Sequence, residues 1–317
     1  MCASIFFNGS YRVYSLYFEL LYFGALQQLM LSFIMDAVIL NMLGFFLSIF
    51  TSIIAIMSCL LILLQRRYRQ NLEFFIYATT CFAISLLSLS LFSLTIRTLK
   101  LDFSIGYNSD SVICRLQAYF VCVTASASFN GYCLQAASRL IHIVYRQHVW
   151  LRTFKFHLLA VIFSWLLACL LMCPYLIIEN FLVYLPNENY CLIAFTNLPG
   201  MIYIFLSTFI IQFGFVTLVY FRLVVFLHHS NVQNANREIA VVKSIFYTVL
   251  TMSSIGMLNA IVWAVYFFTN YFHSMSYRLQ LLSYSISTLL MNVVMIVTNP
   301  RLRSLVFIRK RTVRPLR

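Results

Sequence analysis

The feature that most constrains the fold of this chain is a series of seven long runs without a charged side chain. Between residues 37 and 300, Asp, Glu, Lys and Arg are absent from seven stretches of 22 to 34 residues each. A helix needs about 20 apolar residues to cross roughly 30 Å of hydrocarbon. The sequence therefore predicts seven membrane-spanning helices. The expected spans are 37–64, 74–96, 112–143, 157–179, 199–226, 241–268 and 279–299.

Composition supports a membrane protein and excludes several other classes. Of the 317 residues, 62% are hydrophobic and 9% are charged, whereas soluble domains have about 45–50% apolar and about 25% charged residues. A water-soluble fold could not bury so much apolar surface. A soluble enzyme, a nucleic-acid-binding protein and a disordered chain are therefore excluded. The expected fold class is an all-α membrane protein with a seven-transmembrane helix bundle.

The net charge of +14 is distributed unevenly over the loops between the runs. Of the 22 Lys and Arg residues, 17 fall on one side of the predicted bundle and 5 on the other. Because cytoplasmic loops carry the excess of Lys and Arg, the N-terminus is predicted outside and the C-terminus in the cytoplasm. The basic side can also contact anionic membrane lipids, so no nucleic-acid partner is needed to explain the charge.

Three regions follow from this topology. Residues 1–35 form an N-terminal extracellular extension, residues 36–300 the bundle, and residues 301–317 a short basic cytoplasmic tail with an interfacial helix. The sequence leaves open whether residues 1–34 belong to the mature protein. The loops between spans are short, and no soluble domain is inserted.

Residues that could support catalysis or metal binding do not occur in a recognisable pattern. The six histidines are not joined by a carboxylate inside a span, and no CxxC pair or zinc-type spacing is present. We therefore expect no enzymatic activity, cofactor or metal. The predicted span interiors also lack Asp, Glu and Lys, which disfavours an ion-coupled transporter. A small-solute transporter or channel for apolar solutes stays open as an alternative.

Two of the nine cysteines lie where a disulfide can form. Cys114 is at the outer end of the third span, and Cys191 is in the outer loop between the fourth and fifth spans. The extracellular compartment is oxidising, so topology alone makes a bridge between them plausible.

The joint spacing of several residues provides a family resemblance. Arg139 follows Cys114 by 25 positions in the triplet Ser138-Arg139-Leu140, Trp165 stands 26 positions further on, and the stretch NPRLRSLVF begins at Asn299. Over about residues 36–310, this pattern resembles the rhodopsin-like (class A) G-protein-coupled receptors, as a divergent, chemoreceptor-like member. The resemblance implies a plasma-membrane receptor that binds an extracellular ligand and activates a heterotrimeric G protein.

The resemblance also assigns the coupling residues. Those expected to take part in G-protein coupling and activation are Ser138, Arg139, Leu140, Glu238, Asn299 and Pro300. In the family the triplet is Asp-Arg-Tyr, so Ser138 and Leu140 depart from it. A relative that has lost G-protein coupling is therefore a second alternative.

Candidate ligand contacts lie in the outer halves of the predicted helices. They are Phe120, Val121, Thr124, Tyr203, Trp263, Phe267 and Tyr284. Amine receptors of the family carry an aspartate seven positions after the third-helix cysteine, where this chain has Val121, so the ligand is not expected to be an amine. An aromatic, uncharged pocket suits a neutral or apolar ligand, or a peptide held by the outer loops.

Overall fold

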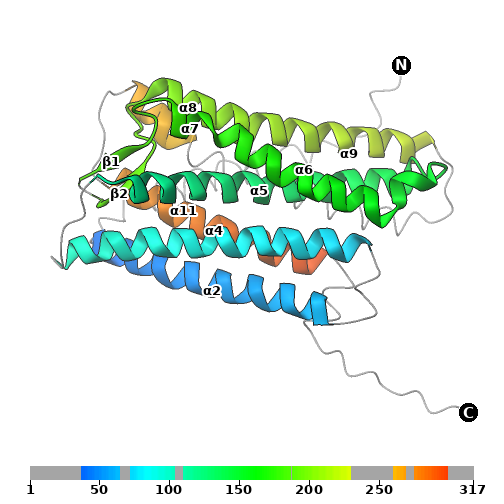
Figure 1. Ribbon diagram of the computed structural model, residues 1–317, viewed down its shortest axis with the longest axis horizontal. Helices are drawn as coiled ribbons and strands as arrows, with labels where there is room; N and C mark the ends of the chain where they lie inside the picture. The colour runs from blue at the N-terminus through cyan, green and yellow to red at the C-terminus, as the bar shows by residue number, and fades with distance from the viewer. Residues whose placement is uncertain are drawn as a thin grey trace, which may run out of the picture.

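The computed structural model describes residues 37–64, 72–103, 110–186, 188–229, 260–268 and 275–298. These residues form a bundle of long helices that lie nearly side by side, with one small hairpin at an end (Figure 1). The long helices are α2 (Ala37–Leu64), α4 (Leu72–Asp102), α5 (Val112–Ile143), α6 (Phe154–Met172), α9 (Ile211–His229) and α11 (Ser276–Thr298). The shorter elements are η1 (Val149–Arg152), α7 (Pro174–Ile177), β1 (Val183–Leu185), β2 (Tyr190–Leu192), α8 (Leu198–Ile204) and the π-helical η2 (Phe205–Ile210).

Helix α5 occupies the middle of the bundle. It contacts α4 on one side and both α6 and α9 on the other, while α2 packs against α4 and α11 (Figure 1). A close approach of α4 and α5 depends on Gly131, because a Cβ at this position would lie 2.6 Å from the Thr80 hydroxyl. Only glycine leaves room for that contact, which brings two spans of the core together.

The described helices agree with most of the predicted spans. Six of them are long and apolar enough to cross a membrane, by length and composition. Many of their large apolar side chains are exposed on the outside of the bundle, including Phe46, Phe163 and Phe221. Such a surface is unsuited to water and suited to lipid. Of the predicted span 241–268, the structure describes residues 260–268, which are helical.

Helix boundaries shift by a few residues from the predicted ones, and three differences are larger. Helix α4 continues to Asp102, past Arg97 and Lys100, because a charged residue at a helix end does not interrupt the backbone hydrogen bonds. Helix α6 ends at Met172, and Pro174 begins the separate short helix α7, where the missing proline N–H has no helical partner to lose. The predicted loop 180–198 contains an antiparallel hairpin in which Tyr184 pairs with Cys191.

Hydroxyl groups inside the helices are satisfied mainly by their own backbone. Ser88, Thr98 and Ser128 each donate a hydrogen bond to the carbonyl four residues earlier. This pairing lets polar residues occupy an apolar bundle without an unsatisfied donor. Glu238, Asn299, Pro300, the N-terminal extension 1–35 and the tail 301–317 lie outside the described residues, and their predicted roles stay predictions.

Candidate functional site

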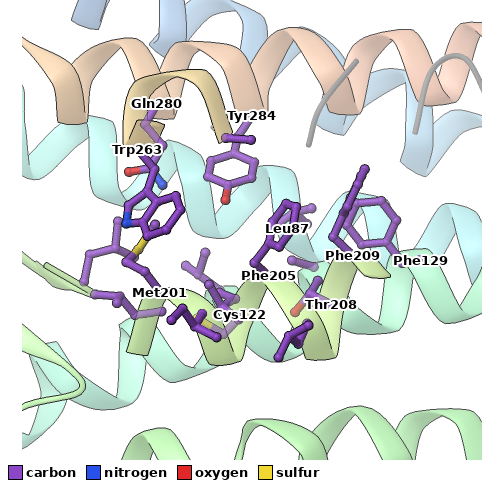
Figure 2. A pocket seen from close by; sticks show the side chains of 18 of the residues that line it. Leu87, Cys122, Phe129, Met201, Phe205, Thr208, Phe209, Trp263, Gln280 and Tyr284 are labelled. Carbon is purple, nitrogen blue, oxygen red and sulfur yellow. The ribbon is translucent and has the colours of Figure 1, made fainter. Parts of the chain in front are cut away.

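The bundle interior contains a cavity of about 420 Å³. Helices α4, α5, α8 and α11, the π-helical η2, strand β2 and the helical residues 260–268 contribute to its wall. Figure 2 shows Gln280 and Tyr284 entering it from α11, on the side opposite Phe205 and Thr208 of η2. Its size falls in the range of roughly 300–1,000 Å³ typical of small-molecule sites.

The wall of this cavity is almost entirely apolar. Five aromatic rings contribute to it: Phe129, Phe205, Phe209, Trp263 and Tyr284. Among the described lining residues none carries a formal charge, and Thr208 and Gln280 are its polar aliphatic side chains. An apolar wall with few polar groups can hold a ligand by shape and orient it by a small number of hydrogen bonds.

The hairpin β1–β2 contributes to the wall of this cavity and is held by a disulfide. Cys191 of β2 is bonded to Cys114 in the first turn of α5, so the predicted bridge is confirmed. The neighbouring residues Leu192 and Ile193 line the cavity. The bridge therefore fixes the position of Leu192 and Ile193 in the cavity wall. We call this end of the bundle the disulfide end.

A buried ionic cluster lies at the same end, formed by Arg278, Asp102 and Glu188. The Arg278 Nη2 lies 2.9 Å from Asp102 Oδ1, and its Nε lies 3.1 Å from Glu188 Oε2. Asn41 of α2 donates a further hydrogen bond of 2.6 Å to Asp102. The cluster thereby joins α2, α4, α11 and the hairpin turn.

The charges in this cluster are unequal, since one guanidinium faces two carboxylates. The Glu188 side chain is only 2% exposed. Its burial raises the pKa of the Glu188 carboxyl to about 7, because loss of water outweighs the attraction of Arg278, and Asp102 adds a smaller repulsion. Glu188 therefore titrates close to neutral pH.

The opposite end of the bundle carries Arg139, and we call it the Arg139 end. Arg139 is half-buried and donates a hydrogen bond of 3.0 Å to the Tyr77 hydroxyl of α4. Tyr220 of α9 also hydrogen bonds with Arg139. Ser138 is buried, and its hydroxyl has no hydrogen-bond partner, whereas Leu140 packs against an apolar cluster with Val216 and Leu223. The identified partners of Arg139 are uncharged.

The structure brings together three of the seven predicted ligand contacts. Val121, Trp263 and Tyr284 line the cavity. Phe120 and Phe267 are exposed on the outside of the bundle. Thr124 is buried with its hydroxyl bonded back to α5, and the Tyr203 hydroxyl donates to the Leu171 carbonyl. Residues on the same half of a helix thus divide between the cavity, the packed core and the lipid-facing surface.

Several lining residues were not anticipated from the sequence. Gln280 and Thr208 supply polar atoms to the cavity, and Leu192 reaches it from the hairpin. A signal for Leu192 was present, because the residue beside a bridging cysteine must lie close to the third span. No signal separated Gln280 from the other uncharged polar residues of the spans.

The described residues include no group of three or more His, Cys, Asp or Glu side chains that could hold a metal ion.

Comparison with known families gives one match. The family model of the 7 transmembrane receptor (rhodopsin family) matches residues 54–302, more than half of the chain. No curated protein matches the chain.

Proposed function

We propose that this chain, which belongs to the rhodopsin family of seven-transmembrane receptors, is a plasma-membrane receptor that binds an extracellular ligand in the cavity and activates a heterotrimeric G protein. The disulfide end is then extracellular and the Arg139 end cytoplasmic, with the N-terminus outside. The uneven distribution of Lys and Arg supports this orientation.

The observation that carries the proposal is the course of α5. Val121, Cys122 and Ala125 of this helix line the cavity, and Arg139 is 18 residues beyond Val121 on the same helix. At 1.5 Å per residue, the helix spans about 27 Å between the two sites. A change of α5 position caused by a ligand therefore reaches Arg139 through one continuous rigid element.

The proposed G-protein contacts are those that the family resemblance assigns. Ser138, Arg139 and Leu140 lie at the end of α5, and Glu238, Asn299 and Pro300 are expected beside them. Anionic lipids are the proposed partners of the basic tail.

The test is a G-protein-dissociation assay in reporter cells, run with a panel of small molecules. We expect a ligand-dependent signal that Arg139→Ala abolishes at unchanged surface expression. An epitope added before residue 1 should be detected on intact cells, and an epitope after residue 317 only on permeabilised ones. The opposite labelling would contradict the orientation.

A second candidate is a receptor relative without G-protein coupling, which Ser138 favours because it replaces the acid of the family's triplet. This relative would bind ligands in the cavity and give no G-protein signal with any of them. Net flux of an apolar solute into vesicles would instead identify a transporter or channel.

A further inference from the structure

The cavity contains a polar atom that the protein leaves unpaired. Gln280 is 8% exposed and lines the cavity, yet its Oε1 has no hydrogen-bond partner. The same side chain shares a hydrogen bond with Tyr284, so the amide is held in place while its carbonyl oxygen stays free. A buried acceptor without a donor costs about 1–3 kcal/mol, and a ligand donor at this position would recover it.

A second unpaired group comes from the opposite wall. Thr208 lies in the π-helical η2, and its Oγ1 is buried without a hydrogen-bond partner. The neighbouring Ser207 behaves as most hydroxyls of the bundle do and donates to a backbone carbonyl, that of Tyr203. Thr208 thus differs from the hydroxyls that are satisfied within their own helix. π-Helical turns in proteins are often found at functional sites.

Charge in the surroundings excludes an ionic ligand. The described lining residues have no formal charge, and the sequence between residues 244 and 277 contains no Asp, Glu, Lys or Arg either. Arg278 is two positions before Gln280, but its guanidinium is bonded to Asp102 and Glu188, and none of these three residues is among those that line the cavity. An ion transferred into this wall would lose its hydration without a counter-charge.

We propose that the ligand is a neutral, mostly apolar small molecule with a hydroxyl group that donates a hydrogen bond to Gln280 Oε1. A second polar atom at the other end of the molecule can pair with Thr208 on the opposite wall. The five aromatic rings hold the apolar body, and the unpaired Gln280 oxygen selects the alcohol. This inference rests on the proposed function only in that it uses the same cavity, and it concerns binding rather than signalling.

The experiment compares three probes of matched length on the purified full chain in lipid nanodiscs. The probes are a primary alcohol, its methyl ether and the corresponding primary amine, each taken through a series of chain lengths from 8 to 16 carbons (about the size the cavity admits). Binding is measured as the shift of the thermal unfolding midpoint with probe concentration. We expect the alcohol to bind about tenfold more tightly than the ether, because the ether cannot donate. The amine, which is protonated at neutral pH, should give no saturable shift.

Two variants and a matched control locate the effect. Gln280→Leu removes the unpaired acceptor, so it should fold and should bind alcohol and ether equally. Thr208→Val, on the opposite wall, should affect alcohol and ether alike, because a probe with its one hydroxyl at Gln280 presents only its chain to Thr208. Thr124→Val makes the same replacement on α5, outside the cavity, and should leave the preference for alcohol unchanged.

Each result bears on the proposal. The proposal would be overturned if alcohol and ether bound equally, if ether or amine bound more tightly than alcohol, or if no probe bound. It would also be overturned if Gln280→Leu kept the preference for alcohol. Because no G protein is present, the two proposals fail separately. Alcohol binding without signalling in cells would contradict the proposed function alone, and signalling driven by a charged ligand would contradict the ligand class alone.

Discussion

Two arginines, at opposite ends of the bundle, are held in different ways. Arg278 is bonded to two buried carboxylates on different elements, Asp102 of α4 and Glu188 of the hairpin turn. Arg139 is bonded to tyrosine hydroxyls, from Tyr77 of α4 and Tyr220 of α9. Within the part of the chain that the structure describes, the identified partners of Arg278 are carboxylates and those of Arg139 are tyrosine hydroxyls.

The difference indicates which end of the bundle can change. Removing an arginine from two buried carboxylates leaves uncompensated charges, which is strongly unfavourable. Separating an arginine from a hydroxyl costs only about 1.5–3 kcal/mol, and water or a partner protein can replace the bond. The ionic cluster thus favours a fixed shape at the disulfide end, whereas the hydrogen bonds from Arg139 to Tyr77 and Tyr220 can be exchanged at lower cost.

The largest expected effect comes from breaking the covalent bond at the disulfide end. The bridge between Cys114 and Cys191 spans 77 residues, and a loop of that length corresponds to roughly 4–5 kcal/mol of unfolded-state entropy in the chain model. We expect Cys114→Ser or Cys191→Ser to abolish surface expression, measured by antibody labelling. Cys169→Ser, which alters a free cysteine, should express normally. Mass spectrometry that found both Cys114 and Cys191 as free thiols in folded protein would contradict the bridge.

Replacing each arginine by glutamine tests the comparison directly. We expect Arg278→Gln to lower the free energy of unfolding by about 3–5 kcal/mol, because two buried carboxylates lose their cation. Arg139→Gln should lower it by about 1–2 kcal/mol. The measurement is thermal unfolding of each variant in nanodiscs. Combining Arg278→Gln with Asp102→Asn and Glu188→Gln should restore most of the lost stability, because no buried charge is then left unpaired. Equal losses of stability in Arg278→Gln and Arg139→Gln would contradict the proposed difference between the two arginines.

The pH dependence of stability isolates Glu188 within the cluster. Its pKa is raised from 4.5 to about 7, so the folded state binds the proton more tightly than the unfolded state does. The stabilisation from protonated Glu188 is complete below pH 4.5 and is lost as the pH rises through about 7. We expect the wild type to be more stable at pH 5 than at pH 8 by roughly 1–3 kcal/mol from this group, measured by thermal unfolding.

Glu188→Gln should flatten this pH profile and should be no less stable than the wild type at pH 8. Asp110→Asn is the control, because Asp110 pairs with Arg115 on the exposed surface at the same end, and it should leave the profile between pH 5 and 8 unchanged. A wild-type profile that instead rises from pH 5 to pH 8, with Glu188→Gln destabilised at pH 8, would mean that the ion pair outweighs the cost of burial.

The contrast between the arginines also shows what could be predicted from the sequence. Arg278 lies between two uncharged runs of the sequence. On that basis it was interpreted as the boundary between two spans, and not as a member of a buried ion pair. Sequence order places Asp102 and Glu188 at the same end as Arg278, because all three lie beside predicted span ends. The pairing of carboxylates with cations depends on the path of the hairpin. The hydrophobic periodicity of the sequence does not predict that path.

Span positions and the disulfide were predictable for a physical reason. Charged side chains are rare in the stretch of about 20 residues that crosses the hydrocarbon. The runs without charged residues therefore indicate the positions of the spans directly. The cavity was less predictable, because nearly every residue of these spans is apolar and composition no longer separates inside from outside. Phe120 and Val121 are adjacent, yet one is exposed and the other lines the cavity. That assignment depends on the rotation of α5, which a uniformly apolar helix does not encode in its hydrophobic pattern.

In the rhodopsin-like family, the triplet arginine is restrained by an acid at the start of the sixth helix, and the resemblance places Glu238 at that position. If Glu238 forms an ion pair with Arg139, Glu238→Gln should raise agonist-free G-protein activation about five- to thirtyfold in the equilibrium constant. The readout is G-protein dissociation in reporter cells, normalised to surface expression. Unchanged basal activity would leave Glu238 only the role of a favourable charge at a helix N-terminus.

The smallest expected effect comes from removing one hydroxyl at the Arg139 end. Tyr77→Phe deletes the acceptor that holds the Arg139 guanidinium against α4, and Tyr77 itself is buried in the bundle. A loss of about 1 kcal/mol should raise agonist-free activation about fivefold, in the same G-protein-dissociation assay. Tyr145→Phe, an exposed tyrosine just beyond α5, should have no effect. If Tyr77→Phe lowered basal activity at normal expression, the hydrogen bond would belong to the signalling state, and the neutral contacts at this end would support activation rather than restrain it.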